Sequence, residues 1–119
     1  MMNEGPRFNC AVDSAMSVIE GRWKCTIICL LANNGSMRFN ELLNTIGEIS
    51  SRMLSRQLKE LERDGIVSRT VDDSHSLKVI YSLTDKGKTL LPILKDLAMW
   101  GLHHQFPNMV DIELTCETL

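Results

Sequence analysis

The sequence lacks the features that mark membrane proteins, secreted proteins and most enzymes. Its 119 residues contain no apolar run close to the ~18 residues that span a bilayer, and residues 1–10 contain no apolar segment of the signal-peptide kind. No set of nucleophile, base and orienting group, no glycine-rich phosphate loop and no suitably spaced carboxylate pair occurs. We therefore expect a cytoplasmic protein that does not bind membranes and is not an enzyme.

Metal-binding spacing is also missing. The four cysteines include no CxxC pair, and the three histidines lie far from them in the sequence. The cysteines are Cys10, Cys25, Cys29 and Cys116. We expect free thiols rather than a disulfide framework, and neither a metal site nor another cofactor.

The chain has little net charge, which is -2 at pH 7, so it is not a polycation attracted to any nucleic acid. The charges are instead distributed unevenly. Residues 52–63 carry four cations against Glu60 and Glu62, whereas residues 107–119 carry acids and no cation. One face is therefore expected to be basic and the C-terminal end acidic.

The most informative stretch is residues 51–64, where an apolar and a cationic pattern share one helical period. Leu54, Leu58 and Leu61 fall on one side, which we expect in the core. The cations recur at i, i+4, i+7 and i+11 on the opposite side: Arg52, Arg56, Lys59 and Arg63. Ser50 suits the N-cap position and Gly65 the left-handed position after the helix. A solvated surface helix is the alternative reading of this segment alone.

The flanking segments give that helix a context. An apolar pattern at residues 39–46 predicts a preceding helix, and the short turn at 47–50 is typical of a helix-turn-helix. Residues 66–71 and 78–83 alternate like strands and predict a hairpin with its loop at 72–77, while Ser36 to Arg38 could add a third strand. The fold class is thus mainly α with a small β-hairpin wing over residues 66–83, a winged helix-turn-helix within one domain, 1–119.

The remaining segments predict further helices. A short helix is expected at 13–19 and another at 23–32, whose core stripe leaves Cys25 and Cys29 on a different face. Thr84 should cap a long helix that Pro92 kinks, and residues 108–117 suggest a last helix. The helix after Thr84 has more apolar surface than a small core covers, which favours a homodimer. The expected dimerisation residues are Leu90, Leu94, Leu97 and Trp100.

Several short motifs occur together in a characteristic order. They include Gly21-Arg22-Trp23-Lys24, Arg38-Phe39-Asn40-Glu41-Leu42, the run Ile49 to Leu61, Asp64-Gly65, Tyr81-Ser82-Leu83-Thr84 with Gly87, and Trp100-Gly101. Over about residues 10–104 the chain resembles the HxlR-type winged helix-turn-helix regulators, which are related to the MarR group. The resemblance implies a homodimer held by N- and C-terminal helices, the latter within residues 84–117. It also implies a pseudo-palindromic operator whose major groove receives the helix from Ser51 to Asp64.

Two positions depart from the family pattern. Ala11 follows Cys10 where relatives usually have proline, and the wing loop begins with Asp72 and Asp73, which would repel phosphate. The resemblance marks Cys10 as a redox-sensing position in some relatives, and an inert cysteine packed at the dimer interface is the alternative. No cluster of polar residues identifies a small-molecule effector.

Contacts to DNA can be assigned along the helix, because the N-terminal part of a recognition helix reaches deepest into the groove. We assign Ser51, Arg52, Ser55 and Arg56 to base edges, with Gln57 a weaker candidate, and Lys59 and Arg63 to phosphates. Asn40, Arg69 and Lys78 are further candidates for the phosphate backbone, against plain solvated side chains. The expected function is that of a DNA-binding transcriptional regulator, and the alternative is a winged helix that binds only proteins.

Overall fold

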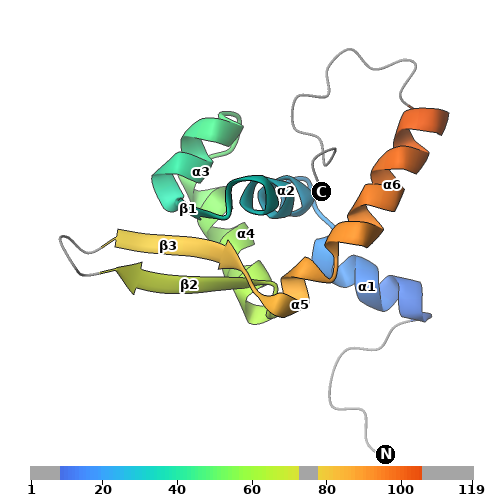
Figure 1. Cartoon of the computed structure of the whole chain (residues 1–119), viewed down its shortest axis with the longest axis horizontal. Coiled ribbons are helices and arrows are strands. Elements are labelled where there is room, and N and C mark those ends of the chain that lie inside the picture. Colours follow the sequence, from blue (N-terminus) through green and yellow to red (C-terminus); the bar gives the residue numbers. More distant parts are fainter. Residues whose placement is uncertain (1–8, 73–77, 106–119) are drawn as a thin grey trace, which may run out of the picture.

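The computed structural model describes residues 9–72 and 78–105, which form six helices and a three-stranded antiparallel sheet (Figure 1). The mainly helical winged helix-turn-helix fold predicted from the sequence is confirmed. The elements are α1 (Ala11–Ile19), α2 (Lys24–Asn34), β1 (Ser36–Arg38), α3 (Phe39–Ile46), α4 (Ser51–Arg63), β2 (Val67–Asp72), β3 (Lys78–Leu83), α5 (Asp85–Lys88) and α6 (Leu91–His104).

The sheet has the strand order β1-β3-β2, so the last strand of the hairpin lies in the middle. Val67 pairs with Leu83 at the inner end of the hairpin, and Asp72 pairs with Lys78 at its outer end. The short β1 pairs with the other edge of β3 and confirms the third strand. In Figure 1 the wing projects from one end of the molecule, while α1 and α6 lie at the other end.

One apolar core joins the helices to the sheet. Leu54, Leu58 and Leu61 of α4 are almost completely buried, as the leucine pattern predicts. They belong to one cluster with residues of α2, α3 and the inner end of the hairpin. Buried leucine side chains each contribute roughly 1.5–3 kcal/mol relative to exposed ones, so this face fixes the orientation of α4.

The end of α4 and the start of α5 are bonded to each other. The backbone N–H of Thr84 donates to the carbonyl oxygen of Ile66 at 3.0 Å, and its hydroxyl donates to Gly65. The same hydroxyl accepts from the N–H of Gly87 at 2.9 Å, which confirms Thr84 as a helix cap. Lys86 adds a hydrogen bond from Nζ to the carbonyl oxygen of Asp64 at 2.8 Å. The end of α4, the inner end of the hairpin and the start of α5 therefore meet at one junction.

The boundaries of three predicted helices need correction. The first helix begins at Ala11 rather than Asp13, and the second runs from Lys24 to Asn34 rather than from 23 to 32. The long kinked helix expected after Thr84 is two helices, and Pro92 lies in the first turn of α6 instead of its interior. In the first turn the missing N–H of proline has no partner to lose, so Pro92 favours a new helix start rather than a kink.

Some predictions concern segments outside the described residues. The expected wing loop falls mostly on residues 73–77, and the expected last helix and Cys116 fall within 106–119. The acidic wing tip and that helix thus stay predictions.

Candidate nucleic-acid interface

Helix α4 begins and ends where its capping residues predict. Ser50 accepts a hydrogen bond at its Oγ from the backbone N–H of Met53 at 3.1 Å, and Gly65 has a φ of 77°. A positive φ of this kind costs glycine little, and it turns the chain from the helix into β2. The helix that carries the candidate DNA contacts is therefore fixed at both ends.

The cationic pattern on α4 forms an exposed ridge, which we call the α4 ridge. Its middle part lines a hollow of about 450 Å³ formed by Arg52, Ser55, Arg56, Lys59 and Glu60. The Arg56 and Arg63 side chains are 72% and 67% exposed. Ser51 is also exposed at the N-terminal end. Donors of hydrogen bonds and positive charges thus lie together on the side opposite the buried leucines, an arrangement that suits both base edges and phosphates.

Gln57 does not belong to the α4 ridge. Its side chain is only 9% exposed, and Nε2 donates to the sulfur of Met53 at 3.7 Å. The buried Oε1 has no hydrogen-bond partner among the described residues. Its i, i+4 spacing from Leu61 already places Gln57 nearer the leucine side of α4 than the cationic side, and the structure shows it packed inward. We therefore remove it from the candidate contacts.

Behind the α4 ridge lies an ion pair that sequence reasoning missed. Lys24 of α2 is 3% exposed, and its Nζ lies 2.7 Å from Oε1 of Glu60. The other carboxylate oxygen, Oε2, accepts from Nε of Arg56 at 3.3 Å. The hydrogen bond from Lys24 lowers the pKa of Glu60, burial opposes this, and Arg56 adds a smaller lowering. Glu60 and Arg56 are i, i+4 neighbours on α4, a spacing that can be found from the sequence, whereas Lys24 lies too far away in the sequence to be found in that way.

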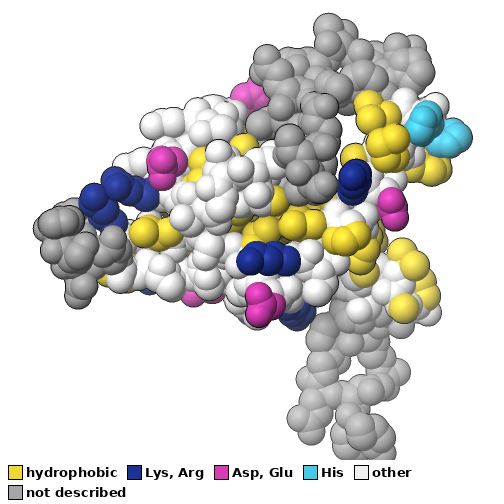
Figure 2. Space-filling model, viewed as in Figure 1, with side chains coloured by type: hydrophobic (Ala, Val, Ile, Leu, Met, Phe, Trp, Pro, Cys, Tyr) yellow, Lys and Arg dark blue, Asp and Glu magenta, His cyan; other side chains and the backbone are white. Residues whose placement is uncertain are grey.

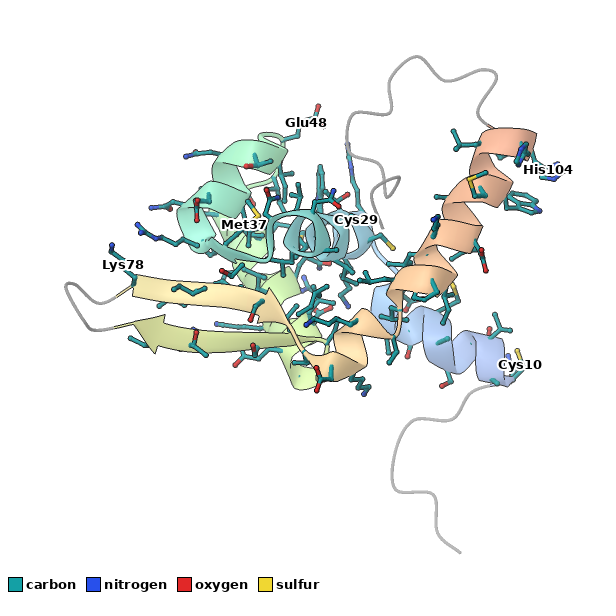
Figure 3. The ribbon with its side chains drawn as sticks, in the orientation of Figure 1. Cys10, Cys29, Met37, Glu48, Lys78 and His104 are labelled. Carbon is teal, nitrogen blue, oxygen red and sulfur yellow. The ribbon has the colours of Figure 1, made fainter. Side chains whose placement is uncertain are left out.

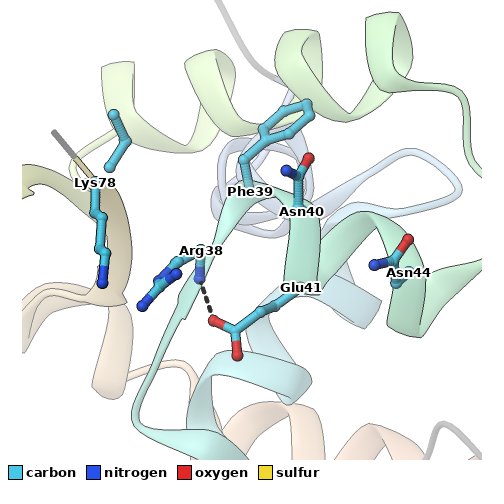
Figure 4. Close-up of a pocket in the computed structure, with 7 residues that line it drawn as sticks. Arg38, Phe39, Asn40, Glu41, Asn44 and Lys78 are labelled. Atoms are coloured by element: carbon cyan, nitrogen blue, oxygen red, sulfur yellow. Dashed lines mark hydrogen bonds between the residues drawn. The ribbon is translucent and has the colours of Figure 1, made fainter. Parts of the chain in front are cut away.

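A second candidate surface lies between α3 and the base of the wing. Arg38, Asn40 and Lys78 line a groove of about 350 Å³, together with Phe39, Glu41, Asn44 and Val79. Arg38 and Lys78 extend into this groove from different strands, and Glu41 bonds the backbone N–H of Arg38 at 2.8 Å rather than its guanidinium (Figure 4). Asn40 and Lys78 are among the contacts predicted from the sequence, and the structure adds Arg38 to them. Arg69 is exposed on β2, opposite Tyr81 of β3.

An apolar surface covers the other end of the molecule. Figure 2 shows hydrophobic side chains gathered over α6 and α1, away from the wing. Leu97 and Trp100 are 51% and 57% exposed, in keeping with the role predicted for them. Leu94 is instead buried in the core of its own chain, and Leu90 packs against that core. Only the outer part of the predicted dimerisation set is therefore available to a partner.

The described cysteines have three different environments. Cys10 is an exposed free thiol at the N-cap of α1, at the end of the molecule opposite Lys78 (Figure 3). Cys25 is also a free thiol, but burial raises its pKa. Cys29 is buried and disulfide-bonded, so the expectation of free thiols is wrong at this position. Cys29 is buried, but the main core cluster contains Ile27, Ile28, Leu30 and Leu31 of α2 and not Cys29, as expected for a residue off the main core face.

Within residues 9–72 and 78–105, no helix is both long and apolar enough to cross a membrane. The same part of the chain brings no three His, Cys, Asp or Glu side chains into a group that could hold a metal ion.

A short helix, a tight turn, a second helix with an exposed cationic ridge and a hairpin wing together define a winged helix-turn-helix protein. A family model described as HxlR-like helix-turn-helix matches residues 18–109. The chain therefore belongs to the HxlR-type helix-turn-helix transcriptional regulators, and the resemblance noted in the sequence is confirmed.

Individual relatives support the same assignment. The uncharacterized HTH-type transcriptional regulator BH0655 of Halalkalibacterium halodurans is 52% identical over 90 residues, which are 76% of this chain and 80% of that protein. The redox regulator HypR in its reduced form is 40% identical, with a TM-score of 0.75 over 82% of this chain and 96% of that chain. Reduced YodB from B. subtilis is 37% identical, with a TM-score of 0.76 over 91% of this chain and 99% of that chain. YodB has also been solved after diamide treatment and with quinone bound.

Proposed function

We propose that this chain regulates transcription by binding an operator in double-stranded DNA as a homodimer, with α4 in the major groove. The observation that carries the proposal is the α4 ridge, because the same helix buries its leucines and presents cations to solvent. An α-helix fits the major groove of B-DNA, where arginine can read guanine and lysine can neutralise phosphate.

Base reading and charge neutralisation are divided along the ridge in this proposal. Ser51, Arg52, Ser55 and Arg56 occupy the N-terminal half of α4 and face the base edges, whereas Lys59 and Arg63 lie further along and contact phosphates. Arg56→Ala should cost about 1–3 kcal/mol of operator binding and relax specificity at one position. Lys59→Ala should weaken all duplexes alike and lower the salt slope by about one.

The groove between α3 and the wing base extends the contact surface. Arg38 and Lys78 bring two positive charges into it, and Asn40 adds an amide. We assign these three side chains, and the exposed Arg69 of β2, to the DNA backbone, where charge rather than base identity decides the interaction. Arg38→Ala should therefore reduce affinity for operator and random DNA by the same factor.

The second subunit is proposed to cover the apolar surface on α6 and α1. Leu97 and Trp100 are large side chains left half exposed, and Val12 and Met16 are exposed on α1, which lies at the same end of the molecule as α6 (Figure 1). Exposed apolar side chains gathered at one end of a protein mark an interaction site. Twofold symmetry would then present two copies of α4 to a pseudo-palindromic operator.

A gel shift tests the DNA-binding proposal directly. The probe is a duplex from the region upstream of the gene, the competitor is a shuffled duplex of equal length and composition, and both are titrated at rising salt. Preference for the upstream duplex that is reduced in Arg56→Ala supports the proposal. Equal affinity for both duplexes would refute specific binding, and absence of binding to either would favour the alternative of a winged helix that binds only proteins.

We further propose that Cys10 senses oxidants or electrophiles. It is an exposed free thiol, and the relatives include a redox regulator. Operator binding by wild type and by Cys10→Ser should be compared before and after diamide, with Cys25→Ser as the matched control. If Cys10 is the sensor, diamide changes binding by wild type and Cys25→Ser but not by Cys10→Ser. The same response in all three proteins would exclude it.

A further inference from the structure

One acid, Glu60, lines the hollow of the α4 ridge, and it has two partners of different kinds. Glu60 contacts an exposed cation of its own helix, Arg56, and a buried cation of another helix, Lys24. The Lys24 ammonium is 3% exposed and 2.7 Å from the carboxylate, so it has little access to water. A buried lysine held in this way restrains the carboxylate more firmly than an exposed partner could.

The atoms that bond to Glu60 determine which nitrogens of Arg56 remain available for a contact with DNA. Oε1 of Glu60 is occupied by Lys24, and Oε2 accepts from Nε of Arg56 at 3.3 Å. An arginine can make a bidentate contact through its two terminal nitrogens alone, and the bond to Glu60 uses Nε instead. The two terminal nitrogens of Arg56 therefore stay directed outward. The two amino groups of a guanidinium can then meet O6 and N7 of guanine.

Charge gives a second reason for this arrangement. A carboxylate on a surface that approaches phosphate repels it, but the Lys24 charge lies directly behind Glu60 and compensates it. The three groups together carry one positive charge, and that charge is on Arg56. The acid can thus orient the arginine without making the surface neutral.

We propose that Lys24 and Glu60 are positioning residues that set the side-chain direction of Arg56 and thereby determine operator selectivity, although Lys24 itself does not touch DNA. This inference rests on the proposed function of the α4 ridge. It predicts that selectivity, which is the ratio of affinities for operator and random duplex, depends on a side chain buried between α2 and α4.

The test compares two variants that each remove one negative charge from α4 or its end. In Glu60→Gln, the amide oxygen can still accept from Lys24, but the amide nitrogen cannot accept from Arg56. In Asp64→Asn, the released partner is Arg63, whose Nε lies the same 3.3 Å from its carboxylate. Glu60→Gln should lower operator selectivity roughly tenfold, with unchanged or higher affinity for random DNA, and Asp64→Asn should leave selectivity unchanged.

The same comparison is repeated in an Arg56→Ala background. There Glu60→Gln should cause no further loss of selectivity, because the side chain that it positions is gone. Lys24→Met should lower selectivity in the wild-type background only. A fall of operator and random affinity by the same factor would show a merely structural role and overturn the inference, as would a further loss in the Arg56→Ala background.

A measurement without DNA separates this inference from the proposed function. In nitrogen-15 NMR spectra of the free protein, the Nε–H proton of Arg56 should exchange with water more slowly than that of Arg63, whose acceptor has no buried lysine behind it. Glu60→Gln should remove this difference. If Arg56 exchanges as fast as Arg63 in wild type, the positioning inference fails even where operator binding is specific. If wild type shows no operator preference, the proposed function fails whatever the spectra show.

Discussion

The sharpest test of the fold concerns Gly87, where α5 meets the strand that follows α4. A Cβ atom on Gly87 would overlap the carbonyl oxygen of Ile66 and lie 3.1 Å from its carbonyl carbon. The obstacle is backbone, which cannot rotate away as a flexible side chain would. The same oxygen accepts the hydrogen bond from the N–H of Thr84. Gly87→Ala therefore has to separate α5 from the end of the recognition helix by roughly 1 Å to reach ordinary contact distances.

The magnitude follows from three contributions. Forcing an additional carbon into a packed site costs about 1–3 kcal/mol, and weakening the Thr84 hydrogen bond adds about 1 kcal/mol. Alanine is the better helix former and returns about 1 kcal/mol. The free energy of unfolding of Gly87→Ala should therefore fall by about 1–3 kcal/mol, which corresponds to a decrease in Tm on the order of 10 °C.

Urea unfolding followed by circular dichroism measures this change at matched protein concentration. Gly101→Ala is the control, because a Cβ at Gly101 in α6 meets no atom within 4 Å. That variant should equal or exceed wild type in stability, since only helix propensity changes. If Gly87→Ala also proves as stable as wild type, the close approach of α5 to Ile66 is not a feature of the protein in solution.

Four further predictions concern the buried pair, the thiols and the apolar surface. Glu60→Ala should lower the free energy of unfolding by about 3–5 kcal/mol, because it leaves the Lys24 ammonium buried without its partner. Lys24→Met should lower it by only about 1–2 kcal/mol, because the Glu60 side chain that it leaves behind is 27% exposed. Equal losses of the two variants in chemical denaturation would refute this asymmetry. The pKa of Glu60 is lowered in the folded protein, so the ionised carboxylate contributes fully to stability above the ordinary carboxyl pKa. This contribution is lost as the pH falls through the lowered pKa of the folded protein. Wild type and Glu60→Ala should therefore converge in stability as acid unfolding proceeds. Iodoacetamide at neutral pH should alkylate the exposed Cys10 well before Cys25, whose pKa is raised by burial, and mass spectrometry of early time points that found Cys25 modified first would contradict the structure. Leu97→Glu should be monomeric in sedimentation experiments and should not bind the operator, although it unfolds at a urea concentration similar to that of wild type. A wild-type protein that is monomeric at micromolar concentration would exclude the proposed dimer.

The parts of this fold that local chemistry determines could be predicted from the sequence. Ser50, Gly65 and Thr84 mark helix ends through hydrogen bonds and backbone angles that involve only the next few residues. The leucine period of α4 and the alternation of the hairpin strands likewise depend only on neighbouring positions. The winged helix-turn-helix followed from the order of these local signals.

The remaining features depend on contacts between distant segments. Lys24 looks like a surface lysine until α4 packs over it and Glu60 of that helix pairs with it. Arg38 gains its relevance only because β1 pairs with β3 and brings Lys78 to the same groove. Leu94 looked available to a partner because spacing along one helix cannot show that the core of its own chain occupies it.

The junction at Thr84 has a geometric consequence for a protein that reads two half-sites at once. Helix α6 continues from this junction for 14 residues and is therefore about 21 Å long. If two subunits join through the outer part of α6, a rotation of only 10° between α6 and the junction shifts α4 and the wing of each subunit by about 4 Å relative to the twofold axis. Adjacent half-sites on one face of DNA lie about 34 Å apart, so after such a rotation the two copies of α4 would no longer match consecutive major grooves. In the proposed dimer, the direction of α6 relative to the Thr84 junction thus sets the operator spacing that the two subunits can match.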